Sequence, residues 1–284
     1  MLVTVNTLLR RAQKEGYAVG AFNTYNLETT RAITCAAEAQ NAPVIVQLGS
    51  GALKYAGHEA LTALALAEAR HAKIPVAVHL DHCTNLDEIA ACVELGFTSV
   101  MVDGSTLPFA ENIALTCQAV GVAHAKGVSV EAELGSILGR EDRAGAHDAS
   151  ARMTDPVQAE EFVCATKVDA LAVAVGNVHG FYRGEPKLDV ARLAEIRKRV
   201  SIPLVLHGAS GLPDAQITQA IAHGICKFNV NTEIRVAFFD SLAKAFAQAR
   251  QTYDLPTLLN PTIEAMQQVV EAKIELFGCA GKAP

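Results

Sequence analysis

The chain has 284 residues, half of them hydrophobic, and a formal net charge of −6 at pH 7. This length can bury a large core, and it suits a single α/β domain over residues 1–284. No basic stripe with interleaved aromatic residues occurs, which disfavours a nucleic-acid partner. The apolar runs are strand-length and interrupted by Gly, Pro or charged residues, so no membrane span is predicted.

Seven cysteines occur without a Cys-x-x-Cys pair. This usage does not predict a disulfide framework, and residues 1–6 do not resemble a secretory signal. Four cysteines fall in helix-like stretches, where we expect small buried hydrophobic side chains: Cys35, Cys92, Cys117 and Cys164. We therefore expect a cytoplasmic protein with reduced thiols.

Strand-like runs rich in Val, Ala and Leu alternate with helix-like stretches along the whole chain. The predicted strands cover residues 18–23, 44–48, 76–80, 99–103, 129–133, 170–175, 204–206 and 227–230. The predicted helices between and after them cover residues 27–40, 58–71, 86–95, 107–125, 156–166, 189–200, 214–222 and 233–249. Pro43, Pro75 and Pro203 stand just before strands, where proline is tolerated.

Eight strands alternating with helices predict a parallel sheet, and eight is the strand number of the closed (β/α)8 TIM barrel. An open doubly wound sheet is the alternative, but its Gly-x-Gly-x-x-Gly fingerprint after the first strand is missing. Two further helices are expected outside the eight units, over residues 4–15 and 261–277. The N-terminal helix would cover the bottom of the barrel, and the C-terminal helical extension would serve oligomer contacts or simple packing.

Three histidines stand at the C-terminal ends of predicted strands, namely His82, His179 and His207. In a closed parallel barrel these strand ends converge on the face that carries the active site. One histidine in an apolar run is more often a satisfied core residue, but three at equivalent places favour another role. Three converging imidazoles with an open fourth position are typical of a catalytic zinc site.

Asp81 directly precedes His82, and the residues alone leave its role open. Such a carboxylate could orient a metal ligand, bridge to the metal, act as acid and base on a substrate, or cap the following helix. His79 is an alternative ligand on the same predicted strand, or else a polar residue of the barrel interior. His82 is preferred because it lies nearer the end of the strand.

Further carboxylates lie at the C-terminal ends of the fourth and fifth predicted strands, namely Asp103, Glu131 and Glu133. Buried carboxylates are costly unless a cation or hydrogen-bond donors accompany them. We therefore expect these residues to support the histidines or to form a secondary metal position.

Small residues follow the last three strands. Gly180 comes after His179, Gly208-Ala-Ser-Gly211 follows the seventh strand, and residues 229–232 open the last helix of the barrel. Backbone N–H groups of such loops, with a helix N-terminus, bind phosphate, and the loops after strands seven and eight are the usual place. A metal beside such loops predicts a phosphorylated substrate whose carbonyl or enolate oxygen the zinc polarises.

The longest polar stretch covers residues 135–155 and includes Gly139 and Glu141. A segment of this length inside a compact barrel is expected to be a functional lid. We expect it to be mobile without substrate and to close when substrate binds.

Five segments resemble, in order, motifs of the class II, zinc-dependent ketose-bisphosphate aldolases: Leu80-Asp-His-Cys83, Glu131-Ala-Glu-Leu-Gly135, Gly176-Asn-Val-His-Gly180, Leu206-His-Gly-Ala-Ser-Gly211 and Asn229-Val-Asn-Thr232. The resemblance covers essentially the whole chain. The length and compact loops are most similar to the tagatose-1,6-bisphosphate aldolases, with fructose-bisphosphate aldolases close behind. The run Gly139-Arg-Glu-Asp142 departs from the Gly-Gly-Glu-Glu that is common in the fructose-specific branch.

The resemblance implies that His82, His179 and His207 bind one Zn²⁺ per chain. It implies that Asp81 is the acid/base at the aldehyde-derived oxygen and that Glu141 moves the proton at the α-carbon of the ketone. Asp103 and Glu133 match a secondary metal or supporting position. The residues implied to bind dihydroxyacetone phosphate are Gly180, Gly208, Ala209, Ser210, Asn229, Val230, Asn231 and Thr232, with Asn229 also a donor to the enediolate. Ser50 matches a position near the C6 phosphate, which an arginine of the trailing region or of a neighbouring subunit would complete.

The implied reaction is reversible cleavage of a ketose 1,6-bisphosphate, tagatose before fructose, to dihydroxyacetone phosphate and glyceraldehyde 3-phosphate. A homodimer or homotetramer is expected, and a monovalent cation is a second candidate cofactor. Three alternatives are weighed. A Schiff-base aldolase needs a lysine at a strand end, whereas Lys227 begins its predicted strand. A zinc amidohydrolase needs His-x-His where Ala21-Phe-Asn23 stands. A non-catalytic sugar-phosphate-binding protein needs the phosphate loops but no zinc ligands.

Overall fold

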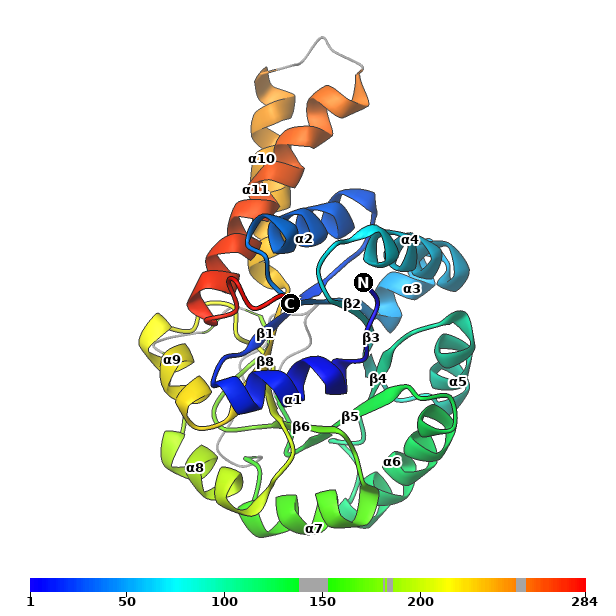
Figure 1. The fold of residues 1–284 in the computed structure, drawn as a ribbon, viewed down its shortest axis with the longest axis vertical. Coiled ribbons are helices and arrows are strands. Elements are labelled where there is room, and N and C mark those ends of the chain that lie inside the picture. The colour runs from blue at the N-terminus through cyan, green and yellow to red at the C-terminus, as the bar shows by residue number, and fades with distance from the viewer. Residues whose placement is uncertain (138–152, 181, 183–185, 249–253) are drawn as a thin grey trace.

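The computed structural model describes all residues except 138–152, 181, 183–185 and 249–253. Eight parallel strands pair in chain order, and the last pairs with the first, so the sheet closes into a barrel (Figure 1). The strands are β1 (Val19–Asn23), β2 (Val44–Gly49), β3 (Val76–Cys83), β4 (Ser99–Val102), β5 (Ser129–Leu134), β6 (Ala170–Val173), β7 (Leu204–Leu206) and β8 (Ile225–Val230). The predicted (β/α)8 barrel is confirmed, and the open doubly wound sheet is wrong.

Helices surround this barrel, because the connection between parallel strands must cross back over the sheet. Several begin at a side chain that accepts a hydrogen bond from the first helical turn, such as Asn85 and Asp155. The described helices are α1 (Val5–Glu15), α2 (Leu27–Ala39), α3 (Ser50–Ala56), α4 (His58–His71), α5 (Leu86–Leu95), α6 (Phe109–His124), α7 (Pro156–Thr166), α8 (Val190–Arg199), α9 (Asp214–Ala222), α10 (Thr232–Gln248) and α11 (Leu255–Leu276). In this part of the chain no helix is long and apolar enough to span a membrane.

Helix α1 lies across the barrel end that faces the viewer in Figure 1. It contacts β1, β3, β5 and β8 and buries one apolar stripe that includes Leu8 and Leu9. The backbone N–H of Asn6 reaches Ser129 Oγ, at the first residue of β5, over 3.4 Å. The helix therefore covers the N-terminal ends of the strands, as predicted, and leaves the C-terminal ends to the site.

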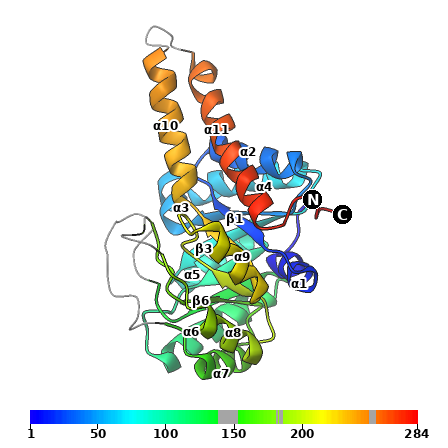
Figure 2. The same cartoon turned by 90° about the vertical axis from the view of Figure 1, so that its left-hand side faces the viewer.

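Helices α10 and α11 pack against each other and form an arm that projects from the barrel (Figures 1 and 2). The prediction began the last helix at Pro261, but α11 begins at Leu255, and Pro261 lies inside it. Asp254 caps the helix by accepting a hydrogen bond from Thr257, and a first-turn proline is compatible with helix geometry. Burial of a stripe at four-residue spacing stabilises the helix despite its internal proline. The stripe consists of Thr262, Met266, Val270 and Ile274.

Three details differ from the sequence-based prediction. Strand β3 extends to Cys83 rather than Leu80, because its backbone pairing continues after the apolar pattern has ended. Helix α3 was not predicted, since Gly49 and Gly51 are more typical of a loop. Strand β8 begins at Ile225, so Lys227 lies within the strand and not at its beginning.

The cysteine prediction is right for only one of the four helical cysteines. Cys92 is buried, whereas the other three are exposed, namely Cys35, Cys117 and Cys164. A place in a helix does not decide burial, because only the stripe that faces the barrel is covered. All seven cysteines are free thiols.

The C-terminal segment is fastened to the barrel by Phe277, whose fully buried ring stacks on Phe228 of β8 with centroids 4.7 Å apart. We expect Phe277→Ala to lower the free energy of unfolding by about 3–5 kcal/mol, because it leaves a cavity in this core. Val157→Ala, on the exposed surface of α7, is the control and should change it by less than about 0.5 kcal/mol. Urea unfolding measures both, and equal effects would contradict the proposed role of Phe277.

Candidate active site

The structure brings the three predicted histidines together at the C-terminal end of the barrel. His82 is the penultimate residue of β3, His179 lies beyond β6, and His207 directly follows β7. One ring nitrogen of each lies within 4.8 Å of the corresponding atoms of the other two. The ring of His82 is 4.7 Å from that of His207 and 4.9 Å from that of His179, measured between centroids. This cluster has the size of a metal site.

The backbone of β3 is distorted where the site begins. Its pairing with β4 shifts register between Leu80 and Cys83, and His82 has a φ of 47°, in the left-handed region. Adjacent side chains on a regular strand point apart, but here Asp81 and His82 both line one cavity. A left-handed non-glycine residue costs roughly 1–2 kcal/mol and is typical of functional sites.

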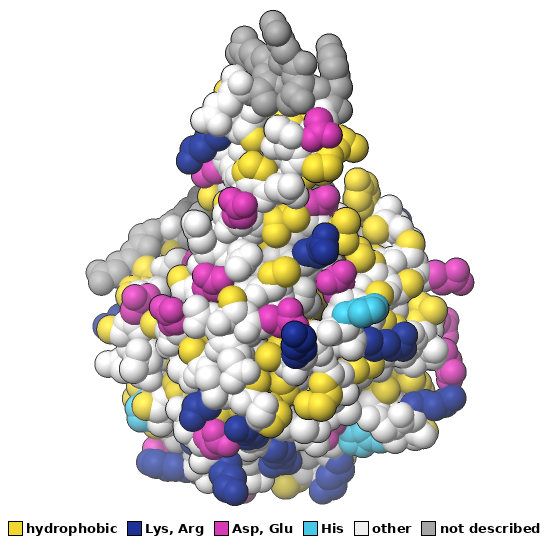
Figure 3. Space-filling view, turned by 45° about the horizontal axis from the view of Figure 1, so that its top comes forward, with side chains coloured by type: hydrophobic (Ala, Val, Ile, Leu, Met, Phe, Trp, Pro, Cys, Tyr) yellow, Lys and Arg dark blue, Asp and Glu magenta, His cyan; other side chains and the backbone are white. Residues whose placement is uncertain are grey.

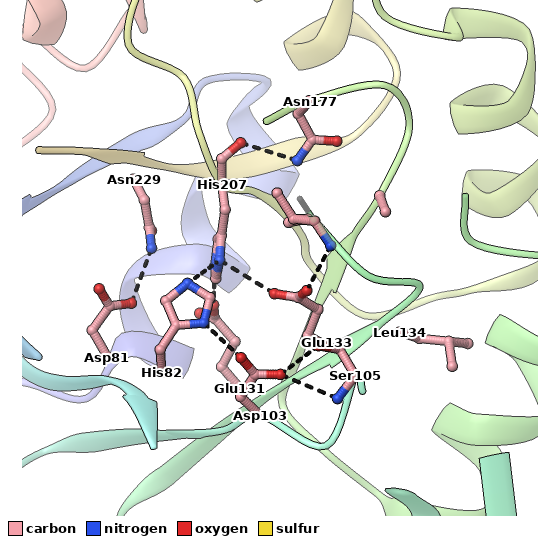
Figure 4. A network of polar contacts seen from close by, with 12 residues as sticks. Asp81, His82, Asp103, Ser105, Glu131, Glu133, Leu134, Asn177, His207 and Asn229 are labelled. Atoms are coloured by element: carbon pink, nitrogen blue, oxygen red, sulfur yellow. Dashed lines mark hydrogen bonds and ion pairs between the residues drawn. The ribbon is translucent and has the colours of Figure 1, made fainter. Parts of the chain in front are cut away.

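The ring nitrogens are arranged to hold a cation. His82 Nε2 and His207 Nδ1 face each other at 3.0 Å (Figure 4). The other nitrogen of each ring is bound to a carboxylate, Asp103 at 2.9 Å for His82 and Glu131 at 2.8 Å for His207. If each ring donates its N–H to its carboxylate in a hydrogen bond, lone pairs remain on the two facing nitrogens. Ligand nitrogens of a tetrahedral zinc lie about 3.3 Å apart, so the donor set fits this metal.

The carboxylates around His82 make this position electronegative. Burial lowers the pKa of His82, but Asp81, Asp103 and Glu133 outweigh burial and raise that pKa well above its ordinary value. Burial opposes ionisation of Asp103, yet hydrogen bonds from His82 and Ser105 hold its pKa below the ordinary range. Burial and the nearby Asp103 raise the pKa of Glu133 to about 8. The position between the rings therefore attracts positive charge, whether a proton or a metal ion.

Asp103 and Glu133 form a second group with His82, in which one possible ligand atom of each lies within 4.8 Å of the others. Glu133 Oε2 also lies 3.5 Å from His207 Nδ1. Both carboxylates thus face the space between the histidines. This arrangement is compatible with either of the two roles predicted for them, support of the histidines or a secondary metal position.

One layer deeper, a buried ion pair stands beneath the histidines. Lys227 Nζ donates to both oxygens of Glu131, at 2.8 and 3.1 Å, and both side chains are almost completely buried. His79 is also fully buried, with Nδ1 bound to Ser99 Oγ at 2.8 Å. Burial and the charge of Lys227 lower the pKa of His79 well below its ordinary value. His79 therefore belongs to the barrel interior rather than to the histidine cluster.

The carboxylate of Asp81 is clamped by three amides. Asn229 donates to Oδ1 at 3.1 Å, while Asn23 and Gln47 donate to Oδ2 at 3.1 and 3.3 Å. Gln47 also donates to Asn23 over 2.6 Å, so the amides support one another. Asn23 and Gln47 were not among the predicted site residues. The only signal was a polar residue near the end of each of two otherwise apolar strands.

A cavity of about 520 Å³ opens beside these groups. Its described lining combines carboxylates, hydroxyls and two of the histidines: Gly49, Ser50, Gly51, Asp81, His82, Thr84, Asp103, Ser105, Thr106, Glu133, Ser136, Ile137 and His179. The predicted residue Ser50 therefore shares one cavity with Asp81 and His82. A cavity of this volume can hold a small polar ligand.

The predicted phosphate loops lie at the same end of the barrel and are tied to each other. The N–H of Ala209 donates to Asn229 O at 3.3 Å, and Tyr182 donates to Gly208 O at 2.8 Å. Gly208 has a φ of 65°, and a Cβ there would clash with Val178 O, so only glycine fits. The remaining loop residues are Gly180, just after His179, Ser210, which is buried, and residues 230–232, where β8 passes into α10.

Glu141 lies outside the described residues, as does most of the predicted lid over residues 135–155. The described end of this segment is anchored, since Thr154 Oγ1 accepts a hydrogen bond from Ala174 N at 2.8 Å and donates to Leu134 O. Thr154 therefore joins the described end of this segment to the C-terminal ends of β5 and β6.

A closed (β/α)8 barrel with clustered histidines and a clamped carboxylate at its C-terminal end is an arrangement typical of metal-dependent lyases and hydrolases. The chain matches the family model of class II fructose-bisphosphate aldolases over residues 3–282. This chain belongs to that family, and it is an aldolase, a carbon–carbon lyase. Family membership excludes the amidohydrolase and Schiff-base alternatives, and Lys227 is in any case held as a buried ion pair.

Solved structures of aldolases are similar over nearly the whole chain. The YdjI aldolase from Escherichia coli K12 is 37% identical, covers 100% of both chains and has a TM-score of 0.90. A protein from Coccidioides immitis assigned as a fructose-1,6-bisphosphate aldolase is 34% identical, with 98% of this chain and 97% of that chain covered and a TM-score of 0.87. The fructose-bisphosphate aldolase of Campylobacter jejuni is 26% identical, with coverage of 99% and 97% and a TM-score of 0.82.

We expect the purified protein to bind one zinc ion per chain, and His82→Ala, His179→Ala or His207→Ala to abolish tight binding. Asp103→Asn should weaken binding by about 10- to 100-fold, because it removes the carboxylate that orients His82. His124→Ala, a histidine at the end of α6 outside the cluster, is the matched control. Competition with a chromophoric chelator measures the affinities. Unchanged affinity in Asp103→Asn would contradict the orienting role.

Proposed function

We propose that this protein catalyses the reversible aldol cleavage of a ketose 1,6-bisphosphate to dihydroxyacetone phosphate and glyceraldehyde 3-phosphate. Tagatose 1,6-bisphosphate is the first candidate substrate and fructose 1,6-bisphosphate the second. The observation that carries the proposal is the facing pair of His82 Nε2 and His207 Nδ1, 3.0 Å apart, beside the clamped carboxylate of Asp81 in a chain of the class II family.

We propose that His82, His179 and His207 hold one Zn²⁺, since their donor set and spacing fit that ion. When bound, the ion supplies positive charge beside the substrate carbonyl, where negative charge develops during cleavage. Asp103 and Glu133 support this arrangement, Asp103 by orienting His82 and Glu133 by facing His207.

In the cleavage direction, Asp81 removes the proton of the C4 hydroxyl, and the bond between C3 and C4 breaks to release the aldehyde. The three amides hold the carboxylate in one orientation, so that one oxygen can be aimed at the hydroxyl. Asn229 donates a hydrogen bond to the enediolate in this proposal, which is supported by the contact of its amide with Asp81 Oδ1 at 3.1 Å. Glu141 then returns a proton to carbon, giving dihydroxyacetone phosphate, and condensation is the reverse.

The C1 phosphate is assigned to the loops after β6, β7 and β8. Backbone N–H groups of small residues and the N-terminus of α10 favour a phosphate there. The assigned residues are Gly180, Gly208, Ala209, Ser210, Asn229, Val230, Asn231 and Thr232. A protein that only binds sugar phosphates would need these loops as well, but it would not need a clamped carboxylate beside a histidine cluster.

We expect the protein to cleave both tagatose and fructose 1,6-bisphosphate, with tagatose preferred. Asp81→Asn should lower kcat by about 10²- to 10⁴-fold, because the amide cannot accept the hydroxyl proton. Zinc content should stay at one ion per chain, which separates loss of the base from loss of the metal. A coupled assay of triose phosphate release measures the rates. Release at the unmodified rate by Asp81→Asn would contradict the proposed base.

Glu141→Ala should slow exchange of the α-proton of dihydroxyacetone phosphate with solvent far more than it weakens binding of that ligand. The reason is that Glu141 is proposed to move this proton and not to hold the phosphate. Proton NMR in deuterated buffer measures the exchange rate, and titration calorimetry measures the affinity. If exchange keeps its original rate while cleavage falls, another group transfers the proton.

We also propose that the arm of α10 and α11 joins two copies of the chain, in a homodimer or homotetramer, in the cytoplasm. The arm carries hydrophobic side chains on its surface (Figure 3), among them Phe239 and Phe246, whose exposed fractions are 60% and 61%. Large exposed aromatic side chains on a projecting helix are typical of an interface. The occupant proposed for this surface is the same arm of a second chain, since symmetric contacts are the commonest in soluble oligomers.

A variant with both Phe239→Glu and Phe246→Glu is expected to be monomeric, because two carboxylates would have to be buried in the interface. Val157→Glu introduces one carboxylate at an exposed apolar position on α7, on the barrel and away from the arm, and should leave the oligomer intact. Light scattering after size exclusion measures the masses. A mass of 30.0 kDa for the unmodified protein would contradict the proposed oligomer.

A further inference from the structure

Ser50 stands at the wall of the 520 Å³ cavity, as the first residue of α3. Its hydroxyl donates a hydrogen bond to Glu88 Oε2, on α5, at 3.0 Å. Gly49, the residue before it, pairs with Asp81 in the register of β2 and β3. Ser50 is therefore placed next to the catalytic end of β3, where the aldehyde half of the substrate is expected.

Glu88 is held from three elements. Besides Ser50, His58 of α4 binds Oε1 through its Nε2 at 3.0 Å, and Cys83 of β3 donates its thiol to Oε2 at 3.4 Å. The Glu88 side chain keeps only 19% of its surface exposed. The carboxylate that accepts the hydrogen bond of Ser50 is thus held in place by its surroundings. The contact between Ser50 and Glu88 is therefore not a chance contact at the surface.

This arrangement decides what Ser50 can offer to a ligand. A serine hydroxyl has one proton to donate and two lone pairs to accept with. Because Ser50 donates its one proton in the hydrogen bond to Glu88, only the lone pairs of its hydroxyl oxygen can bind a ligand in the cavity. Ser105, on the same wall, has the same property, since its hydroxyl donates to Asp103 Oδ1 at 2.6 Å. A phosphate oxygen needs donors, whereas a sugar hydroxyl can donate to Ser50.

The charged residues of the cavity lining also favour a hydroxyl group over a phosphate at this wall. The described lining includes the acidic residues Asp81, Asp103 and Glu133, and no lysine or arginine is found among those lining residues. Apart from the proposed Zn²⁺, this wall therefore holds no fixed cation that would offset the charge of a phosphate dianion. A hydroxyl group carries no such charge.

We propose that Glu88 is a positioning residue that holds Ser50 as a hydrogen-bond acceptor for a hydroxyl group on the aldehyde half, and that the enzyme therefore also acts on ketose 1-phosphates whose aldehyde half carries no phosphate. This inference rests on the proposed aldolase function. It differs from the expectation that Ser50 contacts the C6 phosphate. A phosphate dianion at the same position has no proton to donate to Ser50 and cannot make this contact.

The reaction needs no further reactant. In the condensation direction, the α-carbon of dihydroxyacetone phosphate loses a proton and forms a bond to the aldehyde carbon, while the aldehyde oxygen gains a proton. Glyceraldehyde then gives a ketohexose 1-phosphate with all atoms conserved, and cleavage is the reverse.

The test compares D-glyceraldehyde with D-glyceraldehyde 3-phosphate as partners of dihydroxyacetone phosphate, using the zinc-loaded full chain. The measured quantity is the ratio of the two kcat/KM values, glyceraldehyde over its phosphate. Glu88→Gln has nearly the same shape, but its amide can donate to Ser50 and so turns the serine proton toward the cavity. The ratio is expected to fall by about tenfold, the effect of one hydrogen bond of roughly 1.4 kcal/mol.

Ser50→Ala removes the acceptor itself and should also lower the ratio, which keeps the proposal testable if Glu88→Gln does not fold. Glu94→Gln removes a charge from the exposed side of the same helix and should leave the ratio unchanged. The KM for dihydroxyacetone phosphate should stay the same in all variants, because the changes lie at the aldehyde half.

The proposal is overturned if the unmodified enzyme joins glyceraldehyde 3-phosphate but not glyceraldehyde. It is also overturned if Glu88→Gln and Ser50→Ala keep the same ratio as Glu94→Gln. A chain that joins neither aldehyde and does not exchange the α-proton of dihydroxyacetone phosphate would instead contradict the proposed aldol reaction, on which this inference rests.

Discussion

The buried contact of Lys227 with Glu131 is the constraint on which the site depends. Removing two charges from water costs several kcal/mol, and only close pairing with further hydrogen bonds offsets that cost. Glu131 meets this demand by binding Lys227 at 2.8 Å and His207 at 2.8 Å. The same carboxylate thereby determines which nitrogen of His207 faces His82. Pairing of the buried charges and orientation of a proposed metal ligand therefore depend on the same contacts, which join β5, β8 and the residue after β7.

The distorted end of β3 has a comparable role on the opposite side of the site. A regular strand would turn either Asp81 or His82 away from the cavity. The left-handed His82 lets both side chains face it, and Asp103 binds the ring while Asn229 binds the carboxylate. The strain is therefore compensated by hydrogen bonds from β8 and from the residue directly after β4. These polar contacts hold the proposed acid/base group and the histidines in a rigid frame, as catalysis requires.

The sequence predicted the parts of this site that depend on position along the chain, but not those that depend on pairing between strands. His82, His179 and His207 could be found because apolar runs end at each of them, and closed barrels bring such ends together. The amide clamp by Asn23 and Gln47 depends on the register of β1, β2 and β3, which no local pattern reveals. Pro261 misled for a similar reason, since packing of the buried stripe outweighs a local helix-breaking residue.

One arrangement recurs around the cavity. A polar side chain donates its proton in a hydrogen bond to a carboxylate that lies away from the cavity, and the lone pair of that side chain is left facing the cavity. Asp103 is the carboxylate for His82, Glu131 for His207 and Glu88 for Ser50. A wall built in this way can accept hydrogen bonds from a ligand and offers few donors to a phosphate group. The proposed phosphate site lies instead at the glycine-containing loops after β6 and β7 and at the N-terminus of α10, where backbone N–H groups favour an anion. The division of the site into an acceptor wall and a donor end thus follows from where each proton is held.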